Sequence, residues 1–89
     1  MNTDLQELRA EIDVVDLQLV KLLEQRMDIA RKIGAYKAEH GLSVFDPKRE
    51  NEKISSMRAK AENPENGDAV EKLFHALMDA SKDAQTRIQ

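Results

Sequence analysis

The N-terminal part of the chain carries an apolar ladder whose steps alternate between three and four residues. This spacing is typical of one face of a long amphipathic helix. The members of the ladder are Leu5, Leu8, Ile12, Val15, Leu19, Leu22, Ile29 and Ile33. Neither glycine nor proline occurs before Gly34, and His40-Gly41 forms a typical helix stop. We therefore predict a helix from Asp4 to about Glu39, roughly 50 Å long at 1.5 Å per residue.

Two shorter helices are predicted after a short connection over residues 42–45. Asp46 is a good N-cap and Pro47 suits the first helical position, so the second helix should run from there to about Ala61. A loop-rich stretch over residues 62–67 follows, and Asp68 is expected to cap the third helix with Glu71 as its reciprocal partner. The expected inner face of the third helix is Val70, Leu73, Phe74, Leu77, Met78, Ser81, Ala84, Gln85 and Ile88.

These elements predict an all-α fold of one long and two shorter helices in a single domain over residues 1–89. A long first helix cannot bury its ladder against two short helices of the same chain, and an exposed apolar stripe of that length indicates an interface. We therefore predict an intertwined helical homodimer. Gly34 lies inside the first helix, where glycine costs up to about 1 kcal/mol relative to alanine, and this indicates close packing or the close approach of a ligand at that position.

Composition narrows the possible partners and compartments. The net charge is −3, with 14 basic and 17 acidic residues, which argues against nucleic acid as a partner. The chain has no cysteine, so disulfides and thiolate chemistry are excluded, and a reducing cytoplasm is the expected location. No apolar run approaches the roughly 20 residues that a membrane-spanning helix needs.

Arg26 occupies a position of the apolar ladder itself, and its guanidinium stays charged at ordinary pH. In a packed seam it must therefore meet an anion or remain hydrated. One interpretation is a pairing with Asp16 or Glu50 that fixes the register of the helices. The other is a pocket for a negatively charged ligand.

Further cations and hydrogen-bonding side chains lie on helix faces that are expected to meet. These residues are Arg9, Lys37, Arg49, Ser81 and Gln85. Arg9, Lys37 and Arg49 could equally be surface residues, but a buried amide such as Gln85 is expensive without partners. His40 and His75 have no ligand-like spacing, and neither a metal site nor a cofactor is predicted. Such a set favours electrostatic stabilisation of a dianion over proton transfer or covalent catalysis.

The order and spacing of these residues resemble the all-helical (type II) chorismate mutases over nearly the whole chain. The matching elements are Leu8-Arg9-x-x-Ile12-x-x-x-Asp16, Leu22-Leu23-x-x-Arg26, Lys37, Val44-x-Asp46-x-x-Arg49-Glu50 and Ser81-x-x-x-Gln85. The resemblance implies a cytoplasmic isomerase of aromatic amino-acid biosynthesis. Its members convert chorismate to prephenate by a pericyclic [3,3] rearrangement without a cofactor.

The resemblance also implies a role for each matching residue. Arg26 and Arg9 would bind the substrate carboxylates, with Arg9 supplied by the other subunit, and Ser81 would assist at a carboxylate. Lys37 and Gln85 would donate hydrogen bonds to the ether oxygen. The ring hydroxyl would be received by Glu50 and the backbone around Asp46, and Arg49 would support Glu50 and the pocket wall. An amide at position 85 donates at any pH, so activity is expected at neutral pH.

Two other functions remain open from the sequence. An isochorismate pyruvate-lyase would bind a similar dianion with much the same cations. A non-enzymatic helical adaptor would use the ladder for dimerisation and Arg26 for register, but it would not explain Ser81 and Gln85 on the inner face of the third helix.

Overall fold

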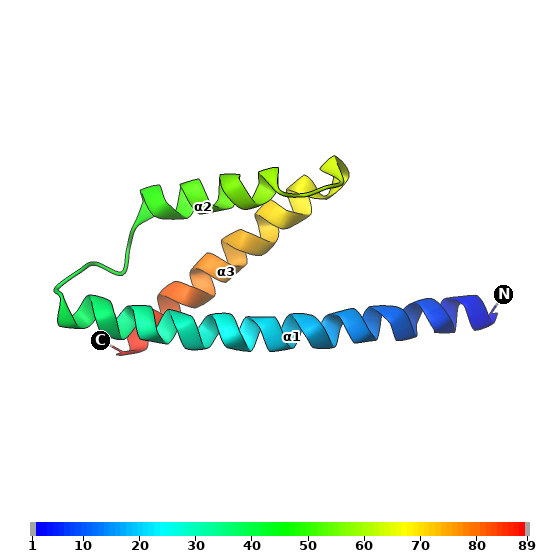
Figure 1. The fold of residues 1–89 in the computed structure, drawn as a ribbon, viewed down its shortest axis with the longest axis horizontal. Helices are drawn as coiled ribbons and strands as arrows, with labels where there is room; N and C mark the ends of the chain where they lie inside the picture. Colours follow the sequence, from blue (N-terminus) through cyan, green and yellow to red (C-terminus); the bar gives the residue numbers. More distant parts are fainter. Residues whose placement is uncertain (1, 89) are drawn as a thin grey trace.

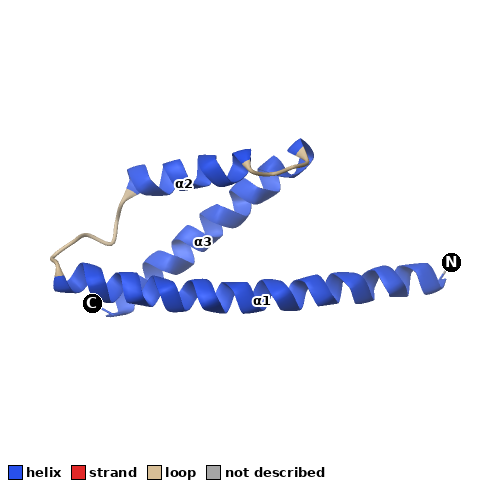
Figure 2. Ribbon diagram, viewed as in Figure 1, coloured by secondary structure: helices blue, strands red, loops and turns tan. Residues whose placement is uncertain are grey.

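The structure, a computed structural model, describes residues 2–88, with side chains for residues 4–87. Over this range the chain is entirely helical and contains no strand (Figure 2). The elements in chain order are α1 (Asn2–Glu39), α2 (Pro47–Ala59), a 3-10 turn η1 (Pro64–Asn66) and α3 (Gly67–Ile88). The prediction of an all-α chain with one long and two shorter helices is confirmed.

Helix α1 has 38 residues, and the longest dimension of the molecule is 58 Å, close to the length of this helix (Figure 1). It begins at Asn2, two residues before the expected boundary. It ends as predicted, because Gly41 adopts a φ of 64°, a left-handed conformation that glycine reaches without strain. The Leu42 N–H then donates to the Lys37 carbonyl at 2.8 Å, which satisfies a carbonyl of the last turn.

Helix α2 begins as predicted, with Asp46 as its N-cap and Pro47 as its first residue. The Asp46 side chain accepts a hydrogen bond from the Arg49 N–H at 3.2 Å, and Pro47 is the first helical residue. The helix ends at Ala59, two residues earlier than predicted. The last turn tightens there, with the Ala61 N–H donating to the Arg58 carbonyl at 3.2 Å.

The predicted start of the third helix is wrong in its details. Asn63 caps the 3-10 turn by accepting a hydrogen bond from the Glu65 N–H at 3.0 Å, and this turn runs directly into α3 at Gly67. Asp68 therefore lies within the first turn of α3 instead of capping it. Its carboxylate and that of Glu71 both lie 2.7 Å from the Arg58 guanidinium. These ion pairs join the end of α2 to the start of α3.

Helix α3 is the element that holds the other two together (Figure 1). It packs against both α1 and α2, whereas no Cα of α1 lies within 8 Å of a Cα of α2 in the described part of the chain. The closest approach involves Gly34, where an added Cβ would lie 2.8 Å from the Gln85 Cα. Only a residue without a side chain permits this crossing, so the close packing predicted at Gly34 is confirmed.

The buried apolar core of the described residues is very small. It consists of Ala30, Ile54 and Ala84. Leu73, which was expected on the inner face of α3, is 48% exposed, whereas its neighbour Phe74 is partly buried. Ile88 was expected on the same face, but its side chain lies outside the described residues.

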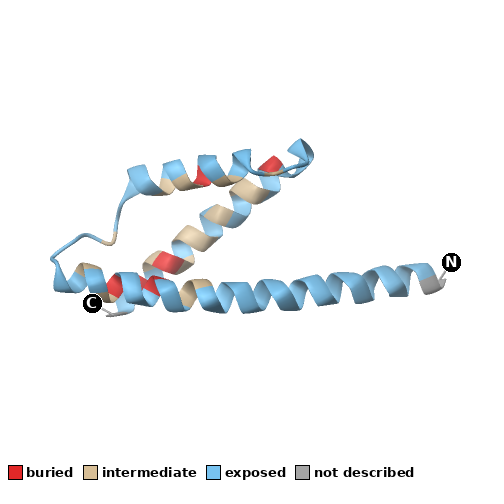
Figure 3. Ribbon diagram, in the orientation of Figure 1, coloured by how far each residue is buried: buried red, intermediate tan, exposed pale blue. Residues whose placement is uncertain are grey.

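Residues 4–25 of α1 are all exposed, because no other described element of the chain packs on them (Figure 3). Their ladder side chains are each between 50% and 62% exposed: Leu5, Leu8, Ile12, Val15, Leu19 and Leu22. Burying a Leu, Ile or Val side chain completely contributes about 1.5–3 kcal/mol, so most of the stabilisation that this ladder could supply is not realised within one chain.

Candidate active site

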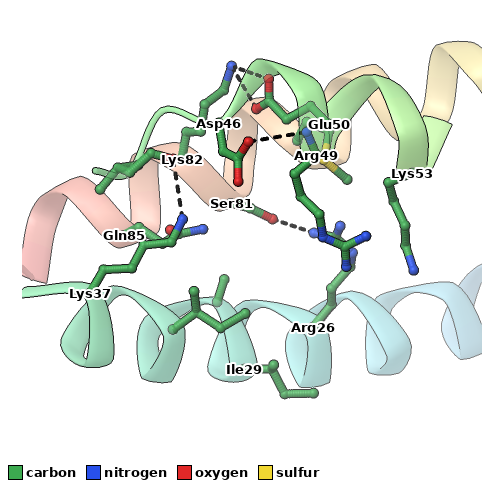
Figure 4. A pocket seen from close by; sticks show the side chains of 14 residues that line it. Arg26, Ile29, Lys37, Asp46, Arg49, Glu50, Lys53, Ser81, Lys82 and Gln85 are labelled. Carbon is green, nitrogen blue, oxygen red and sulfur yellow. Dashed lines mark hydrogen bonds and ion pairs between the residues drawn. The ribbon is translucent and has the colours of Figure 1, made fainter. Parts of the chain in front are cut away.

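A pocket of about 400 Å³ lies between α1, α2 and α3. Because α3 holds α1 and α2 apart, side chains from all three helices can extend into the space between them (Figure 4). The lining residues are Arg26, Ile29, Ala30, Ile33, Lys37, Val44, Asp46, Arg49, Glu50, Lys53, Met78, Ser81, Lys82 and Gln85. The volume falls in the range of small-molecule sites, which is about 300–1,000 Å³.

Arg26 is held at the wall of the pocket by α3. Its Nη1 donates to the Leu77 carbonyl at 3.3 Å and to the Ser81 hydroxyl. Neither Asp16 nor Glu50 of the same chain pairs with it among the described residues, so no ion pair fixes Arg26 within one chain. Partial burial lowers the pKa of the Arg26 guanidinium, although an arginine stays charged at neutral pH. Within the described residues of one chain, it therefore presents a positive charge without a carboxylate partner.

Lys37 and Gln85 lie at the other end of the pocket, near the crossing of α1 and α3 (Figure 4). The Lys37 Nζ donates to the Val44 carbonyl at 3.3 Å, which leaves donors free for a ligand. Gln85 is 7% exposed, and its Oε1 has no hydrogen-bond partner among the described residues. Leaving such an acceptor unpaired costs about 1–3 kcal/mol, whereas any hydrogen bond donated to a ligand would come from the amide Nε2.

Glu50 is bound by a lysine that the sequence analysis did not single out. The Lys82 Nζ lies 3.1 Å from the Glu50 Oε1, and the two side chains are 30% and 19% exposed. Arg49 was expected to support Glu50, but no contact joins the two side chains among the described residues. Figure 4 instead shows the Arg49 side chain extending from α2 toward α1 across the pocket. The expectation for Arg49 is corrected accordingly.

The pocket is strongly cationic although the whole chain is acidic. Five cations line it, with only two carboxylates: Arg26, Lys37, Arg49, Lys53 and Lys82, against Asp46 and Glu50. Of the five, Lys82 alone lies within 4 Å of a carboxylate in the described part of the chain. Like charges gathered in a hollow repel one another unless an anion joins them. The arrangement is therefore suited to a ligand with more than one negative charge.

Seven of the eight residues predicted for the site line this one pocket: Arg26, Lys37, Asp46, Arg49, Glu50, Ser81 and Gln85. The eighth, Arg9, is exposed on α1 and does not line it. It lies 17 residues before Arg26, which is about 25 Å along the helix and beyond the reach of an arginine side chain.

Lys53 and Lys82 are the pocket residues that the sequence analysis missed. A signal was available for Lys53, which follows Arg49 by four residues and therefore shares its helix face. Lys82 directly follows Ser81, but a lysine in an otherwise charged segment looks like a surface residue.

The described residues form neither a metal-binding cluster nor a membrane-spanning helix. Among the described residues, no group of three or more His, Asp or Glu side chains is arranged to hold a metal ion. No helix in the same range is both long and apolar enough to cross a membrane. The functional groups of the pocket are hydrogen-bond donors and fixed positive charges, which can orient an anion and stabilise charge that develops during a reaction.

Comparison with known proteins gives a consistent result. A family model described as "Chorismate mutase type II" matches residues 8–86. The solved structure of chorismate mutase (form II) from Thermus thermophilus superposes with a TM-score of 0.87 at 35% identity, covering 93% of this chain and 94% of that one.

Two curated relatives extend the comparison. The T-protein of Haemophilus influenzae is 32% identical over 75 residues, which are 83% of this chain and 20% of the relative. The chain thus spans about a fifth of that protein's length. A 4-amino-4-deoxychorismate mutase from Streptomyces venezuelae is 39% identical over 46 residues, covering 52% of this chain and 45% of the relative.

Proposed function

The chain belongs to the type II chorismate mutase family, and we propose that it converts chorismate to prephenate. One observation carries this proposal: a small acidic protein gathers five cations around one pocket, and four of them have no carboxylate partner among the described residues. Chorismate carries two carboxylates, so it supplies the negative charge that this pocket lacks. The proposal includes a place in aromatic amino-acid biosynthesis and a cytoplasmic location, which the absence of cysteine supports.

The reaction is a pericyclic [3,3] rearrangement in which the ether C–O bond breaks while a C–C bond forms in the same molecule. No proton is transferred and no covalent intermediate with the protein is needed. The enzyme lowers the barrier by holding the compact chair conformation of the substrate and by stabilising negative charge that grows on the ether oxygen. Fixed hydrogen-bond donors in a partly enclosed site are suited to both tasks.

Lys37 and Gln85 are assigned to the ether oxygen. The Lys37 ammonium group retains free donors, and Gln85, which lines the pocket, can donate through its amide Nε2. Charge on the oxygen strengthens both hydrogen bonds as the transition state is approached. Arg26, steadied by the Leu77 carbonyl and Ser81, is assigned to one substrate carboxylate, with Ser81 assisting.

The remaining residues would orient the ring. Glu50, with the backbone around Asp46, is assigned to the ring hydroxyl, since an ionised carboxylate is an acceptor. Arg49 and Lys53 extend from α2 into the pocket and add positive charge to the wall around the carboxylates (Figure 4).

We further propose an intertwined homodimer in which Arg9 crosses between subunits. Residues two apart on a helix lie about 200° apart around its axis. Val14 and Leu17 therefore lie opposite the ladder residues Ile12 and Val15, and they are 60% and 58% exposed. Apolar side chains on two opposite faces favour a partner that wraps around α1 over one that packs along a single side.

The position of Arg9 supports the same arrangement. The midpoint between Arg9 and Arg26 falls between Leu17 and Gln18. If two copies of α1 pair antiparallel about this point, Arg9 of the partner subunit lies level with Arg26 and can bind the second substrate carboxylate. Each dimer then contains two complete sites, which is the usual result of a two-fold interface.

A mixing experiment tests the shared site. Arg9→Ala and Arg26→Ala should each be nearly inactive as pure proteins. In a mixed dimer one site holds both defects and the other none, so an equal mixture should recover about one quarter of the parental sites after random exchange. If subunit exchange is confirmed and no activity returns, both residues serve the pocket of one chain.

A spectrophotometric assay of chorismate loss, with prephenate identified as the product, tests the activity itself. Isochorismate should be offered in parallel, because a pyruvate-lyase of the same fold would release salicylate and pyruvate instead. The S. venezuelae relative makes an amine-bearing analogue of chorismate a second candidate substrate. A non-enzymatic adaptor would turn over none of the three.

A further inference from the structure

The ion pair between Lys82 and Glu50 lies at the edge of the pocket and has no role in the reaction as assigned above (Figure 4). The Lys82 Nζ lies 3.1 Å from the Glu50 Oε1 and 3.5 Å from its Oε2, so one ammonium group contacts both carboxylate oxygens. It also lies 5.6 Å from the centre of the Phe45 ring and 3.7 Å from Asp79, whose side chain is 79% exposed. The hydrogen bond to Glu50 raises the pKa of Lys82, so this lysine is charged at neutral pH.

A carboxylate held in this way can still accept a hydrogen bond, but its charge is already balanced. An ionised carboxylate has about four lone-pair positions, and one ammonium group does not fill them all. A neutral hydroxyl can therefore donate to Glu50 without adding charge to the site. A protonated amine in the same place would bring a second cation next to the Lys82 ammonium.

The rest of the pocket offers that amine no better partner. The other carboxylate of the lining, Asp46, already accepts the Arg49 N–H as the cap of α2. The remaining charged residues of the lining are all cations. Like charges a few ångströms apart in a partly buried site repel strongly, because water screens them less than at the open surface.

We propose that Lys82 makes the pocket selective for a substrate whose ring carries a neutral hydroxyl, against an analogue with a protonated amine on the same carbon. The inference rests on the proposed function, specifically on the assignment of Glu50 to the ring hydroxyl. Lys82 acts through Glu50 and through its own charge, so it is a specificity-determining residue and not a catalytic one.

The test compares chorismate with 4-amino-4-deoxychorismate on the same enzyme preparations. The measured quantity is kcat/KM for chorismate divided by kcat/KM for the amine. In Lys82→Met, which keeps the length of the side chain and removes its charge, this ratio should shift toward the amine by about tenfold or more. Lys82→Arg keeps the charge and should keep a ratio close to that of the parent.

Lys72→Met is the matched control, because Lys72 is an exposed lysine of the same helix that does not line the pocket. It makes the same change in net charge and should leave the ratio unchanged. If circular dichroism shows that Lys82→Met is unfolded, Lys82→Gln is used instead, and the same shift in the kcat/KM ratio is expected. Loss of folded protein lowers both rates equally and cancels in the ratio.

A ratio that moves by less than about threefold in the neutral variant overturns the inference. An equal shift in Lys72→Met overturns it too, because the effect would then belong to net charge and not to this pair. A parent that does not turn over chorismate contradicts the proposed function instead, so the two failures are distinct.

Discussion

Residues 4–25 of α1 carry large branched side chains that no other described element of the chain buries, whereas its C-terminal half carries small and cationic residues, together with Ile29 and Ile33, that face α3 and the pocket. Leu5 and Leu22 are 52% and 62% exposed, while Ala30 is 3% exposed. One continuous helix thus has two parts of different character: an uncovered half, residues 4–25, and a covered half, residues 26–39. Large apolar residues suit association with another chain. Small residues such as Gly34 let a second helix approach and bring its polar groups within reach of a ligand.

The largest effect is expected from a charge placed at the centre of the uncovered half. Leu19 lies beside the proposed crossing point, so Leu19→Asp would bury two carboxylates in a two-fold interface at a cost of several kcal/mol each. The dimer should dissociate at least about 10³-fold more readily, since each 1.4 kcal/mol is a factor of ten. Activity should disappear with the dimer, because Arg9 of the partner subunit would be lost.

Sedimentation and chorismate turnover at matched concentrations measure this effect. Gln6→Glu adds the same charge at an exposed polar position of α1 far from the proposed crossing point and serves as the control. A Leu19→Asp protein with parental mass and parental turnover would show that the uncovered half is not an interface.

A second prediction concerns the catalytic end of the covered half. Gln85→Glu replaces a donor with an ionised carboxylate, which would repel the charge that develops on the ether oxygen. Turnover at neutral pH should fall by about 10²–10³, the usual cost of one such donor. The protonated form can donate again, so activity should return as the pH falls toward the pKa of this carboxyl, while the parent changes little.

The measurement is a pH profile of kcat for the parent and for Gln85→Glu. Gln85→Ala is the control, because it removes the amide without adding a charge. The alanine variant should be weak at every pH, without recovery in acid. Parental turnover of Gln85→Glu at neutral pH would remove Gln85 from the ether oxygen.

A third prediction tests the small residues of the covered half. Gly34→Ala places a Cβ 2.8 Å from the Gln85 Cα, so backbone must move. The free energy of unfolding should fall by about 1–3 kcal/mol, as in other overpacked sites. Gly67→Ala is the matched control, since its Cβ would meet the flexible end of Arg58 at 3.3 Å. That variant should be neutral or up to about 1 kcal/mol more stable.

Urea unfolding at one fixed protein concentration compares the two variants fairly, because assembly changes apparent stability with concentration. Equal stabilities for the two alanine variants would mean that α3 can move away from α1 without cost. The crossing at Gly34 would then not be a fixed point of the fold.

The smallest effect is expected at a residue of the covered half that does not line the pocket. Arg31 lies 3.2 Å from Asp28, but the two side chains are 54% and 72% exposed. Exposed pairs of this kind contribute about 0–1 kcal/mol, so Arg31→Met should change neither stability nor turnover measurably. A large loss of turnover would mean that part of the active site lies at Arg31, outside the pocket.

The sequence predicted the helices well because their signals are local. The ladder and the Gly41 stop predict α1, and the Asp46-Pro47 start predicts α2, each from a signal that acts within a few residues. The start of α3 was misplaced because a 3-10 turn capped by Asn63 runs directly into the helix, and Asp68 binds Arg58 of α2 instead of acting as the cap. The residue spacing within one helix does not reveal a contact with a residue of another helix.

The residues of the candidate site were predictable where their signal was also local. Residues with an unusual position in an apolar stripe, such as Arg26 and Gln85, were found because a buried polar group stands out in a pattern. Lys53 and Lys82 were missed because lysines on charged helices look like solvent-exposed residues. Lys82 reaches the pocket because of the way α3 packs against α1 and α2, and Lys53 because of the way α2 packs on α3. Glu50 lines the pocket as predicted, but its ion pair with Lys82 depends on the packing of α2 on α3.

The close contact of Gly34 with Gln85 also fixes the point at which α3 touches α1. Any small swing of α3 relative to α1 pivots where their backbones touch, so Gln85 moves least. Gly67 lies 18 residues away, about 27 Å along the helix, and a swing of about 5° would displace that end by roughly 2 Å. Helix α2 packs on α3 and not on α1, so it travels with the moving end. A swing of this kind would widen or narrow the pocket at its α2 wall, while Gln85, which we propose meets the breaking bond, would keep its place.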